Sequence, residues 1–429
     1  MSVRNSINFK PLLAFLILLG LTMPLFGQGA SGITGQYPAR AAAGQRMILP
    51  MEQSYNAPPH TEGMLGECFP HLHGTEALHF DYTYTGGVFN NARGGMKTKN
   101  AAVYNGIFDL GITADTEKLG LWRNGTFYVH SFFSHGNSPS RYIQDYQGAS
   151  AFAYETPAQV SEYWYEHRFY NDALTIKSGK QDAGADFFYL ESTADFLNSS
   201  ATCVPTTYIP TAPDNAWGVS GFLKLTEQLC FKAGIFDAQA DANTFWMSEE
   251  GKVYSAYQLE YHTLLRRYFP GFIYAGMWYD DSDVDSMAKL GETVKGNHGF
   301  NFGFEQMLYR RHICRKDDLR GITMFFQYAD SQRDRNELKG FWNLGFHWLG
   351  MFDARPEDAL GFALNTAQFS AGYRAEEGLR YSQETAYEIF YKVQLTENVM
   401  IQPDLQYIVH PGGQHRDSLM PGLVFQVVF

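Results

Sequence analysis

Apolar and polar residues alternate one by one along much of the chain. Between residues 78 and 85, Leu78, Phe80, Tyr82 and Tyr84 are apolar or aromatic, and the residues between them are polar. A period of two places apolar side chains on one face of a β-strand and polar side chains on the other. The pattern therefore predicts strands with one face suited to lipid and one face suited to water.

The same alternation returns in the middle and toward the end of the chain. Residues 257–262, 387–395 and 404–409 repeat it, with Phe390 and Ile408 as exceptions. A soluble β-sandwich can alternate too, but it has no need of so many Tyr and Phe residues near strand ends. A membrane β-barrel uses such residues as aromatic girdles at its two interfaces. The alternation together with the aromatic residues therefore favours a membrane barrel.

Counting back from the C-terminus divides the chain into sixteen strand segments. The connections alternate between short ones, such as 396–399, 353–358, 226–228 and 170–172, and longer ones. Outer-membrane barrels have short periplasmic turns and long external loops, and sixteen strands leave a water-filled lumen. We therefore predict an all-β fold, a transmembrane antiparallel β-barrel of about sixteen strands. The predicted strands are 76–86, 100–113, 122–133, 158–169, 173–182, 215–225, 229–238, 253–263, 270–280, 298–311, 319–329, 340–352, 359–370, 384–395, 400–410 and 418–429.

The chain ends on one of these strands. Leu423, Phe425, Val427 and the terminal Phe429 alternate with the residues between them. A C-terminal strand that ends in Phe resembles the recognition signal of bacterial outer-membrane barrels. The alternative is a soluble edge strand that happens to end in Phe. We expect the barrel-assembly machinery to read Phe429.

The N-terminal region reads as an export signal followed by an arm. Arg4 and Lys10 precede an apolar run from 12 to 26, which is short and broken by Pro24. This pattern is typical of a cleaved signal peptide. We predict a signal peptide at 1–29, an N-terminal periplasmic arm at 30–75 and the barrel at 76–429. The sequence leaves open whether the arm is flexible or plugs the pore.

Composition narrows the class of protein further. The mean hydropathy of −0.29 is too low for a bundle of membrane helices. The net charge of −12 argues against nucleic acid as a partner, because phosphate binding needs a basic surface. The four cysteines, Cys68, Cys203, Cys230 and Cys314, are spaced too widely for a zinc site. Cys68 and Cys314 fall on the periplasmic side and can pair, and four unpaired thiols are the alternative.

The longest connection within the barrel is 183–214, the third external loop by this count. It contains Pro205, Pro210 and Pro213. In general porins the third external loop folds into the lumen and sets its width, and this loop resembles it in position and length. The alternative is a mobile surface loop.

Several short motifs follow one another in a characteristic order. They include residues 86–95 (GGVFNNARGG), 163–166 (YWYE), 177–183 (KSGKQDA), 195–200 (DFLNSS) and 402–407 (QPDLQY). Their order and spacing resemble the OprB family of carbohydrate-selective porins. The resemblance covers most of the chain after the arm. It implies passive diffusion of glucose-like sugars across the outer membrane of a Gram-negative bacterium, with no cofactor.

A pore that favours neutral sugars needs hydrogen-bonding groups and aromatic faces in its lumen, with weak binding so that the sugar can leave. The alternation places a set of such side chains on the inner wall, and the third loop adds two more. Most inward charges in a wide barrel only hydrate its wall, so the strand from Glu162 to Arg168 and the loop at 198–200 are the strongest candidates. The predicted lumen residues are Glu162, Trp164, Glu166, Arg168, Lys177, Asn198, Ser199, Lys232, Glu260, Glu388, Asp404 and Gln406.

Three rival functions stay open at this point. A barrel enzyme, such as an outer-membrane lipase or protease, would need a Ser–His pair or an Asp–His group near the external rim. The sequence has no nucleophile motif such as Gly-x-Ser-x-Gly, and no Ser or His cluster stands out in one loop. A general porin without sugar preference and a structural or adhesive barrel with a closed lumen have no such distinguishing motif. The expected partners are small neutral sugars and outer-membrane lipid. The outer face suits a monomer as well as a homo-oligomer, and the sequence does not choose between them. We expect neither a cofactor, a metal site nor catalysis.

Overall fold

The computed structural model describes residues 74–75, 77–289, 291–313, 315 and 318–429. The predicted signal peptide and nearly all of the predicted arm lie outside these residues. So do Cys68 and Cys314, and the pairing predicted for them stays a prediction. Cys203 and Cys230 are both free thiols.

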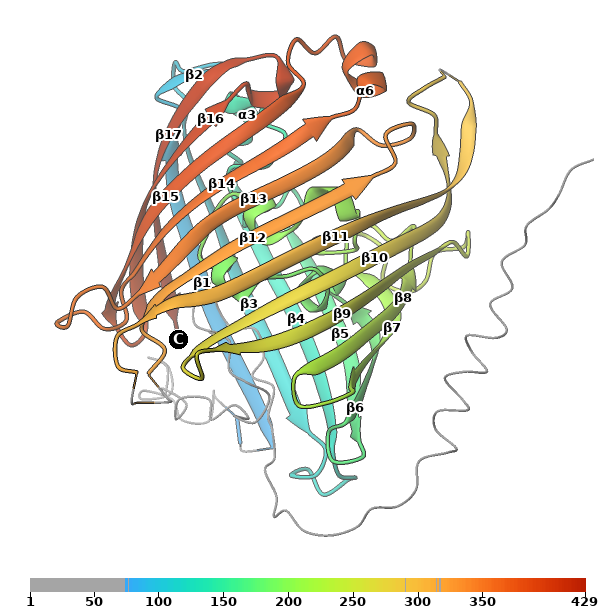
Figure 1. Cartoon of the computed structure of the whole chain (residues 1–429), viewed down its shortest axis with the longest axis vertical. Helices are drawn as coiled ribbons and strands as arrows, with labels where there is room; N and C mark the ends of the chain where they lie inside the picture. Colours follow the sequence, from blue (N-terminus) through green and yellow to red (C-terminus); the bar gives the residue numbers. More distant parts are fainter. Residues whose placement is uncertain (1–73, 76, 290, 314, 316–317) are drawn as a thin grey trace, which may run out of the picture. The chain divides into compact units, whose positions relative to one another are not determined.

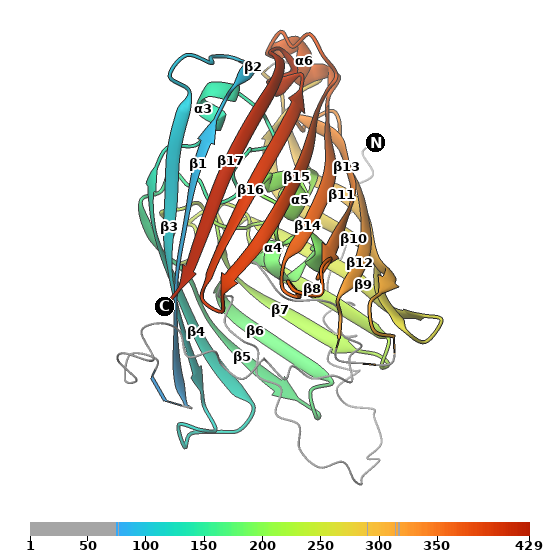
Figure 2. The same ribbon diagram turned by 90° about the vertical axis from the view of Figure 1, so that its left-hand side faces the viewer.

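Sixteen antiparallel strands close into a ring, and a seventeenth, β2 (Arg93–Gly95), pairs with the start of β17 outside that ring (Figure 1). β1 pairs with both β3 and β17, which closes the barrel (Figure 2). The strands of the ring are β1 (Leu78–Asn90), β3 (Ala102–Asp115), β4 (Gly125–Gly136), β5 (Ala158–Phe169), β6 (Leu174–Gln181), β7 (Ala216–Lys224), β8 (Leu229–Asp237), β9 (Val253–Leu265), β10 (Phe269–Asp285), β11 (Thr293–Arg310), β12 (Gly321–Ser331), β13 (Leu338–Leu349), β14 (Ala359–Phe369), β15 (Gln383–Thr396), β16 (Val399–Val409) and β17 (Arg416–Val428).

The predicted fold class and strand count are confirmed. Each predicted segment corresponds to one strand of the ring, and most boundaries agree within three residues. The largest difference is at β10 and β11, where the prediction ended at 280 and resumed at 298. Both strands continue, to Asp285 and from Thr293, and pair with each other beyond a register shift. The sequence pattern did not predict this extension, because residues 280–285 are polar apart from Val284 and do not alternate between apolar and polar.

The register explains why the sequence alternates. Directly opposite residues share a face of the sheet. Thr83 of β1 therefore shares its face with Asp109 of β3, and both point into the lumen. On the other face, apolar side chains such as Val129, Phe133 and Ile273 stay exposed, as a lipid-facing wall requires.

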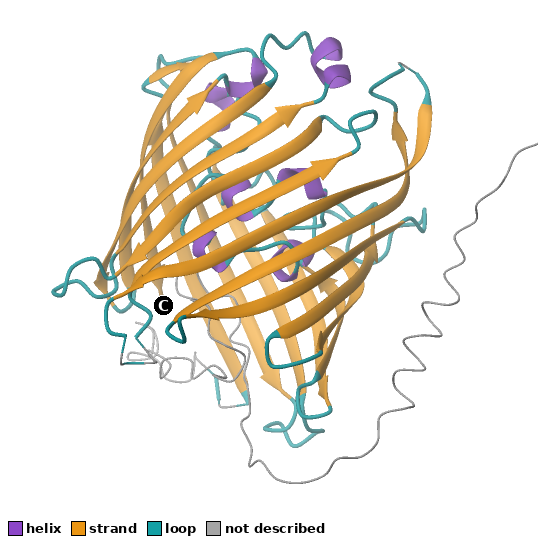
Figure 3. Ribbon diagram, in the orientation of Figure 1, coloured by secondary structure: helices purple, strands orange, loops and turns teal. Residues whose placement is uncertain are grey.

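Short helices interrupt the external loops. The second loop (137–157) contains α3 (Ser140–Ile143). The third loop (182–215) contains α4 (Ala183–Asp186), η2 (Glu191–Thr193), α5 (Ser199–Thr202) and η3 (Pro205–Thr207), and these helices lie inside the barrel (Figure 3). Later loops contain α6 (Ala371–Glu376) and η4 (Pro411–Gly413). Within the described part of the chain, no helix has the length and hydrophobicity needed to cross a bilayer.

Side-chain caps start the helices of the third loop. The Asp182 carboxylate accepts a hydrogen bond from the Ala185 amide at 3.1 Å, and the Asn198 side chain accepts one from the Ser200 amide at 3.2 Å. Such caps satisfy amides that a short helix leaves without partners. They allow the loop to keep a defined shape within the lumen.

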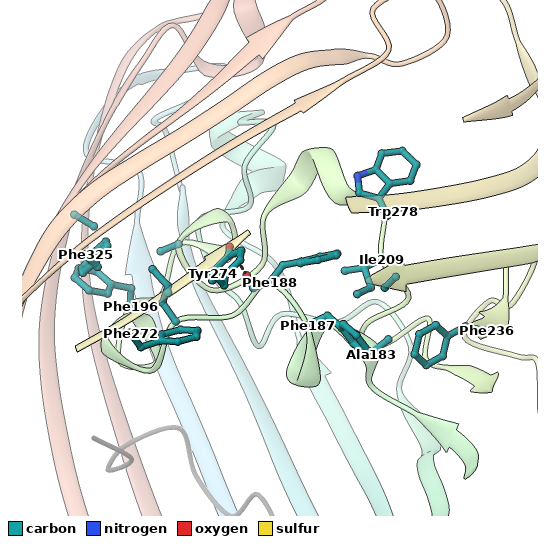
Figure 4. Packing of buried hydrophobic residues seen from close by; sticks show 14 of the residues in the cluster. Ala183, Phe187, Phe188, Phe196, Ile209, Phe236, Phe272, Tyr274, Trp278 and Phe325 are labelled. Atoms are coloured by element: carbon teal, nitrogen blue, oxygen red, sulfur yellow. Dashed lines mark hydrogen bonds between the residues drawn. The ribbon is translucent and has the colours of Figure 1, made fainter. Parts of the chain in front are cut away.

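The third loop forms an apolar core with one side of the barrel wall. Phe187, Phe188 and Phe196 of the loop are at most 2% exposed and pack among inward aromatic rings, including those of Phe272 and Phe325 (Figure 4). The Phe196 ring lies edge-on to Phe325, with 5.6 Å between ring centroids. The prediction that this loop folds into the lumen is confirmed, and the mobile surface loop is excluded.

Candidate functional site

One buried carboxylate fastens the middle of the third loop to the wall. Asp195 accepts hydrogen bonds from Lys392 Nζ at 2.8 Å and His347 Nε2 at 2.9 Å. Its backbone carbonyl accepts a third bond from the Gln402 side chain, also at 2.8 Å. The side chains of Asp195 and Lys392 are only 6% and 5% exposed. Three strands, β13, β15 and β16, therefore converge on one loop residue.

A second anchor lies next to it on β15 and β16. The Glu388 carboxylate accepts hydrogen bonds from the backbone amides of Leu197 and Asn198 at 2.6 and 3.0 Å. Gln406 Nε2 donates to the carbonyl of Ala149 in the second loop at 2.9 Å. Ser199 donates its own amide to Gly148 in the second loop at 2.8 Å, which ties the two loops together.

The second loop has its own anchor, which the sequence did not reveal. Glu384 of β15 accepts the backbone amides of Tyr146, Gln147 and Gly412, at 2.7, 3.0 and 2.6 Å. A carboxylate that accepts several amides holds a loop more firmly than a single hydrogen bond. The second loop is therefore also held against the inner faces of β15 and β16.

Two lysines hold the start of the third loop. Lys177 Nζ forms an ion pair with Asp186 at 2.6 Å, and Lys232 Nζ donates to the Asp186 carbonyl at 3.0 Å. Lys232 also forms an ion pair with Glu260 of β9. Glu162 of β5 accepts the amide of Asp182 at 3.1 Å. The loop is thus held at its start and near its middle.

The inner faces of β1, β3 and β4 keep polar side chains that water can reach. His79 and Asp81 form a pair at 2.9 Å, and their side chains are 33% and 20% exposed. His130 and Asp109 form a second pair at 3.1 Å, with exposures of 17% and 27%. We call these four residues, together with Trp164, the open wall.

Trp164 of β5 pairs with Tyr128 of β4, whose ring stacks with that of His130 in the second pair. Its indole nitrogen donates to Glu162 at 3.2 Å, and Lys177 Nζ lies 4.7 Å from the ring centroid. The ring of Tyr128 lies 4.9 Å away in a tilted arrangement. The indole is partly exposed and held in place on two sides. A rigid aromatic ring beside hydrogen-bonding groups can contact the C–H face of a sugar ring while the polar groups contact its hydroxyls.

The twelve predicted lumen residues divide into two groups. Several hold the loops or one another, and they are largely buried: Glu162, Lys177, Asn198, Ser199, Lys232, Glu260, Glu388, Asp404 and Gln406. The others lie on the inner face of β5: Trp164, Glu166 and Arg168. Glu166 is 4% exposed and faces Lys177 across the strand pair, and Arg168 has an 11% exposed side chain. Contact of any of the twelve with a sugar stays a prediction.

Sequence reasoning missed the two His–Asp pairs and the loop anchor Asp195. His79 and Asp81 alternate with lipid-facing residues, so their inward direction could be read from the sequence. Their partners depend on side-chain geometry, and the pair of Asp109 and His130 depends on the register of two strands.

The anchor at Asp195 leads to a prediction about pH. Burial by itself would raise the pKa of Asp195, but Lys392 and His347 outweigh it and hold the pKa below its ordinary value of 3.8. The contribution of this ion pair to the stability of the packed loop is therefore fully present above pH 3.8. It is lost only as the pH falls through the lower pKa that Asp195 has in the folded protein. We expect the current ratio of an Asp195→Ala variant to wild type to be the same at about pH 8 and about pH 5. Single-channel recordings at both pH values test this, and a ratio that approaches one at the lower pH contradicts it.

Comparisons with known proteins agree with this geometry. Residues 99–429 match the family model described as "Carbohydrate-selective porin, OprB family". Porin B of Pseudomonas aeruginosa is 22% identical over 401 residues, which cover 82% of this chain and 87% of that protein. The high-pH structure of Pseudomonas putida OprB has a TM-score of 0.74 at 20% identity, covering 82% of this chain and 94% of the other. The low-pH structure of the same protein has a TM-score of 0.54 at 18% identity, covering 85% and 96%.

Proposed function

We propose that sugars cross the barrel between the open wall and the third loop. The premise is that this chain belongs to the OprB family of carbohydrate-selective porins. The protein is an outer-membrane porin, and carbohydrates diffuse through it passively. Its family and fold are those of a channel rather than of an enzyme. The proposal concerns where in the lumen the sugar makes contact.

The observation that carries this proposal is the unequal burial of the two sides of the lumen. The third loop forms an apolar core with the inner faces of β7 to β10, β12, β14 and β15. The His79–Asp81 and His130–Asp109 pairs, on the opposite side, keep water-accessible polar atoms. A neutral sugar can exchange its hydration for hydrogen bonds only where such atoms are accessible. Because each pair is partly exposed, contact is weak and reversible, as transport requires.

Liposome swelling tests the proposed function. Folded protein is reconstituted into vesicles, and the entry rates of glucose and of a polyethylene glycol of similar hydrodynamic size are compared. We expect glucose to enter faster, because it can bind the open wall in passing. An Asp109→Ala/His130→Ala double variant should lower the glucose rate and leave the polymer rate nearly unchanged. Equal entry rates of both solutes in the wild type would contradict a sugar contact in the lumen and would indicate a general porin.

The C-terminus leads to a prediction about assembly. The Phe429 amide donates to the Tyr82 carbonyl at 3.0 Å, so the last residue completes the seam between β17 and β1. We propose that the terminal ring is read by the barrel-assembly machinery before the seam closes. A Phe429→Ala variant keeps this backbone hydrogen bond, so it should refold in detergent as the wild type does, yet reach the outer membrane in much smaller amounts. Gel mobility with and without heating measures the folded fraction of the variant, both after refolding in detergent and in outer membranes from cells. A wild-type amount of folded variant in the outer membrane would contradict the proposal.

A further inference from the structure

A cluster of basic residues stands on the external face of this acidic protein. The segments 91–101, 137–144 and 410–416 contain no Asp or Glu, although the whole chain has a net charge of −12. They belong to the first loop, the second loop and the connection into β17. We call their five arginines and lysines the basic rim: Arg93, Lys97, Lys99, Arg141 and Arg416.

Backbone pairing and ring contacts bring the basic rim together. Gly95 of β2 pairs with Arg416, and Arg93 pairs with Leu419. The Lys97 amide donates to the Tyr142 carbonyl at 3.0 Å. The charged ends of Lys97 and Arg141 lie 5.6 and 5.5 Å from the centroid of the Tyr142 ring. Four of the five basic residues are therefore held by their backbones or rings around one small region at the external ends of β1 and β17.

These charges are exposed and form no ion pair within the part of the chain that the structure describes. All five residues are exposed, and among the residues that the structure describes none of them forms an ion pair. The nearest acidic residue in sequence to Arg416 is Asp417, whose carboxylate already accepts bonds from the Tyr407 hydroxyl at 2.9 Å and the His410 amide at 3.1 Å. Asp145, which follows the second segment, is not exposed. Clustered like charges without compensation cost free energy, and an anionic ligand would offset that cost.

We propose that the basic rim binds the phosphate groups of a phosphorylated lipid headgroup in the outer leaflet. Arg and Lys side chains are the usual protein partners of phosphate, because they donate charge-assisted hydrogen bonds. The rim also lies near headgroup height. Tyr387 and Tyr407 pair on the outward faces of β15 and β16 with ring centroids 6.5 Å apart, and Arg93 lies in the same row, because Leu419 pairs with both Tyr407 and Arg93. Tyrosines of this kind mark the membrane interface.

The lumen argues against the other source of phosphate, a dissolved anionic solute on its way through the pore. Such a solute would pass from the rim to a lumen whose exposed side chains include Asp81 and Asp109, with side-chain exposures of 20% and 27%. Carboxylates repel an anion along that path. A ligand that stays at the rim, as a lipid headgroup does, meets no such repulsion.

Lipid binding to the folded full-length protein in detergent micelles tests the proposal. The probes are diphosphoryl lipid A, the same lipid without phosphates, and glucose 6-phosphate. The rim variant is R93Q/K97Q/K99Q/R141Q. The matched control removes four exposed basic residues of the periplasmic turns, as K118Q/K224Q/R266Q/R267Q. Unchanged gel mobility before and after heating shows that both variants are folded.

We expect the rim variant to bind diphosphoryl lipid A at least about tenfold more weakly than wild type, and the control to stay within about twofold. The lipid without phosphates should bind wild type as weakly as the rim variant binds the phosphorylated lipid. Equal affinity of wild type and rim variant overturns the proposal, and so does an equal loss in the control. Rim-dependent binding of glucose 6-phosphate without rim-dependent binding of lipid A would assign the rim to a dissolved solute instead.

Discussion

Replacing Asp195 with alanine is expected to release the third external loop and to about double the open-channel current, because pore conductance rises with the free cross-section. The substitution removes the acceptor that Lys392 and His347 share. Removing one partner of a buried ion pair costs about 3–5 kcal/mol, because the other charge stays buried without compensation. Lys392 can recover hydration only if the loop moves away from the wall. The current should also become noisier, since a released loop fluctuates in the lumen.

A thiol in the same loop gives an independent readout of its release. Burial raises the pKa of the Cys203 thiol to about 12, so the thiol should react slowly with a maleimide while the loop is packed. In a C68S/C230S/C314S background, Asp195→Ala should speed this reaction strongly. The control is an Asp195→Leu/Lys392→Met double variant, which removes both charges and should restore slow labelling and a current near wild type. Slow labelling in the single variant would show that the apolar core alone holds the loop.

Replacing Trp164 with alanine is expected to raise the half-saturating concentration of glucose in current-block experiments about fivefold, because an aromatic contact contributes about 0.5–1.5 kcal/mol. The indole is held against Lys177 and Tyr128 and is the aromatic part of the open wall. Its removal takes away the apolar surface for the sugar ring and leaves the two His–Asp pairs intact. The current without sugar should change little, because Trp164 does not anchor the third loop.

The matched control for this experiment is another tryptophan of the barrel. Trp342 of β13 lies directly opposite Tyr328, which faces outward, so its side chain is on the lipid face. Trp342→Ala removes the same number of atoms and should leave the glucose block unchanged. If both variants weaken the block to the same degree, the effect comes from a general change in the barrel and Trp164 has no special contact with sugar.

The strands could be predicted from the sequence because their pattern is set locally. Each side chain of a strand such as β1 faces either lipid or water, and that choice alternates regardless of which strand lies next to it. The third loop was recognised from its length and its position among the connections, because both can be read along the chain without knowing what the loop contacts. The extended hairpin of β10 and β11 was missed because it projects beyond the lipid, where both faces of a strand can be polar.

The partners within the lumen could not be predicted, because they join residues that are far apart in sequence. Lys392 and Asp195 are separated by 197 residues, and Glu388 and Leu197 by 191. The alternation showed that Glu388 points inward, but not that its oxygens are already occupied by loop amides. It likewise gave no means of separating Trp164, which remains accessible, from Asn198, which is fully buried. That distinction depends on where the loop packs, and the loop carries no periodic signal.

The most direct test of the account is the single-channel conductance of the refolded protein in a planar bilayer, recorded while glucose or a polyethylene glycol of similar size is added. The account predicts a steady open current that glucose reduces in a saturable way, with a much weaker reduction by the polymer at equal concentration. Equal reduction by both solutes would contradict a sugar contact in the lumen, and the absence of any current would contradict the open channel itself.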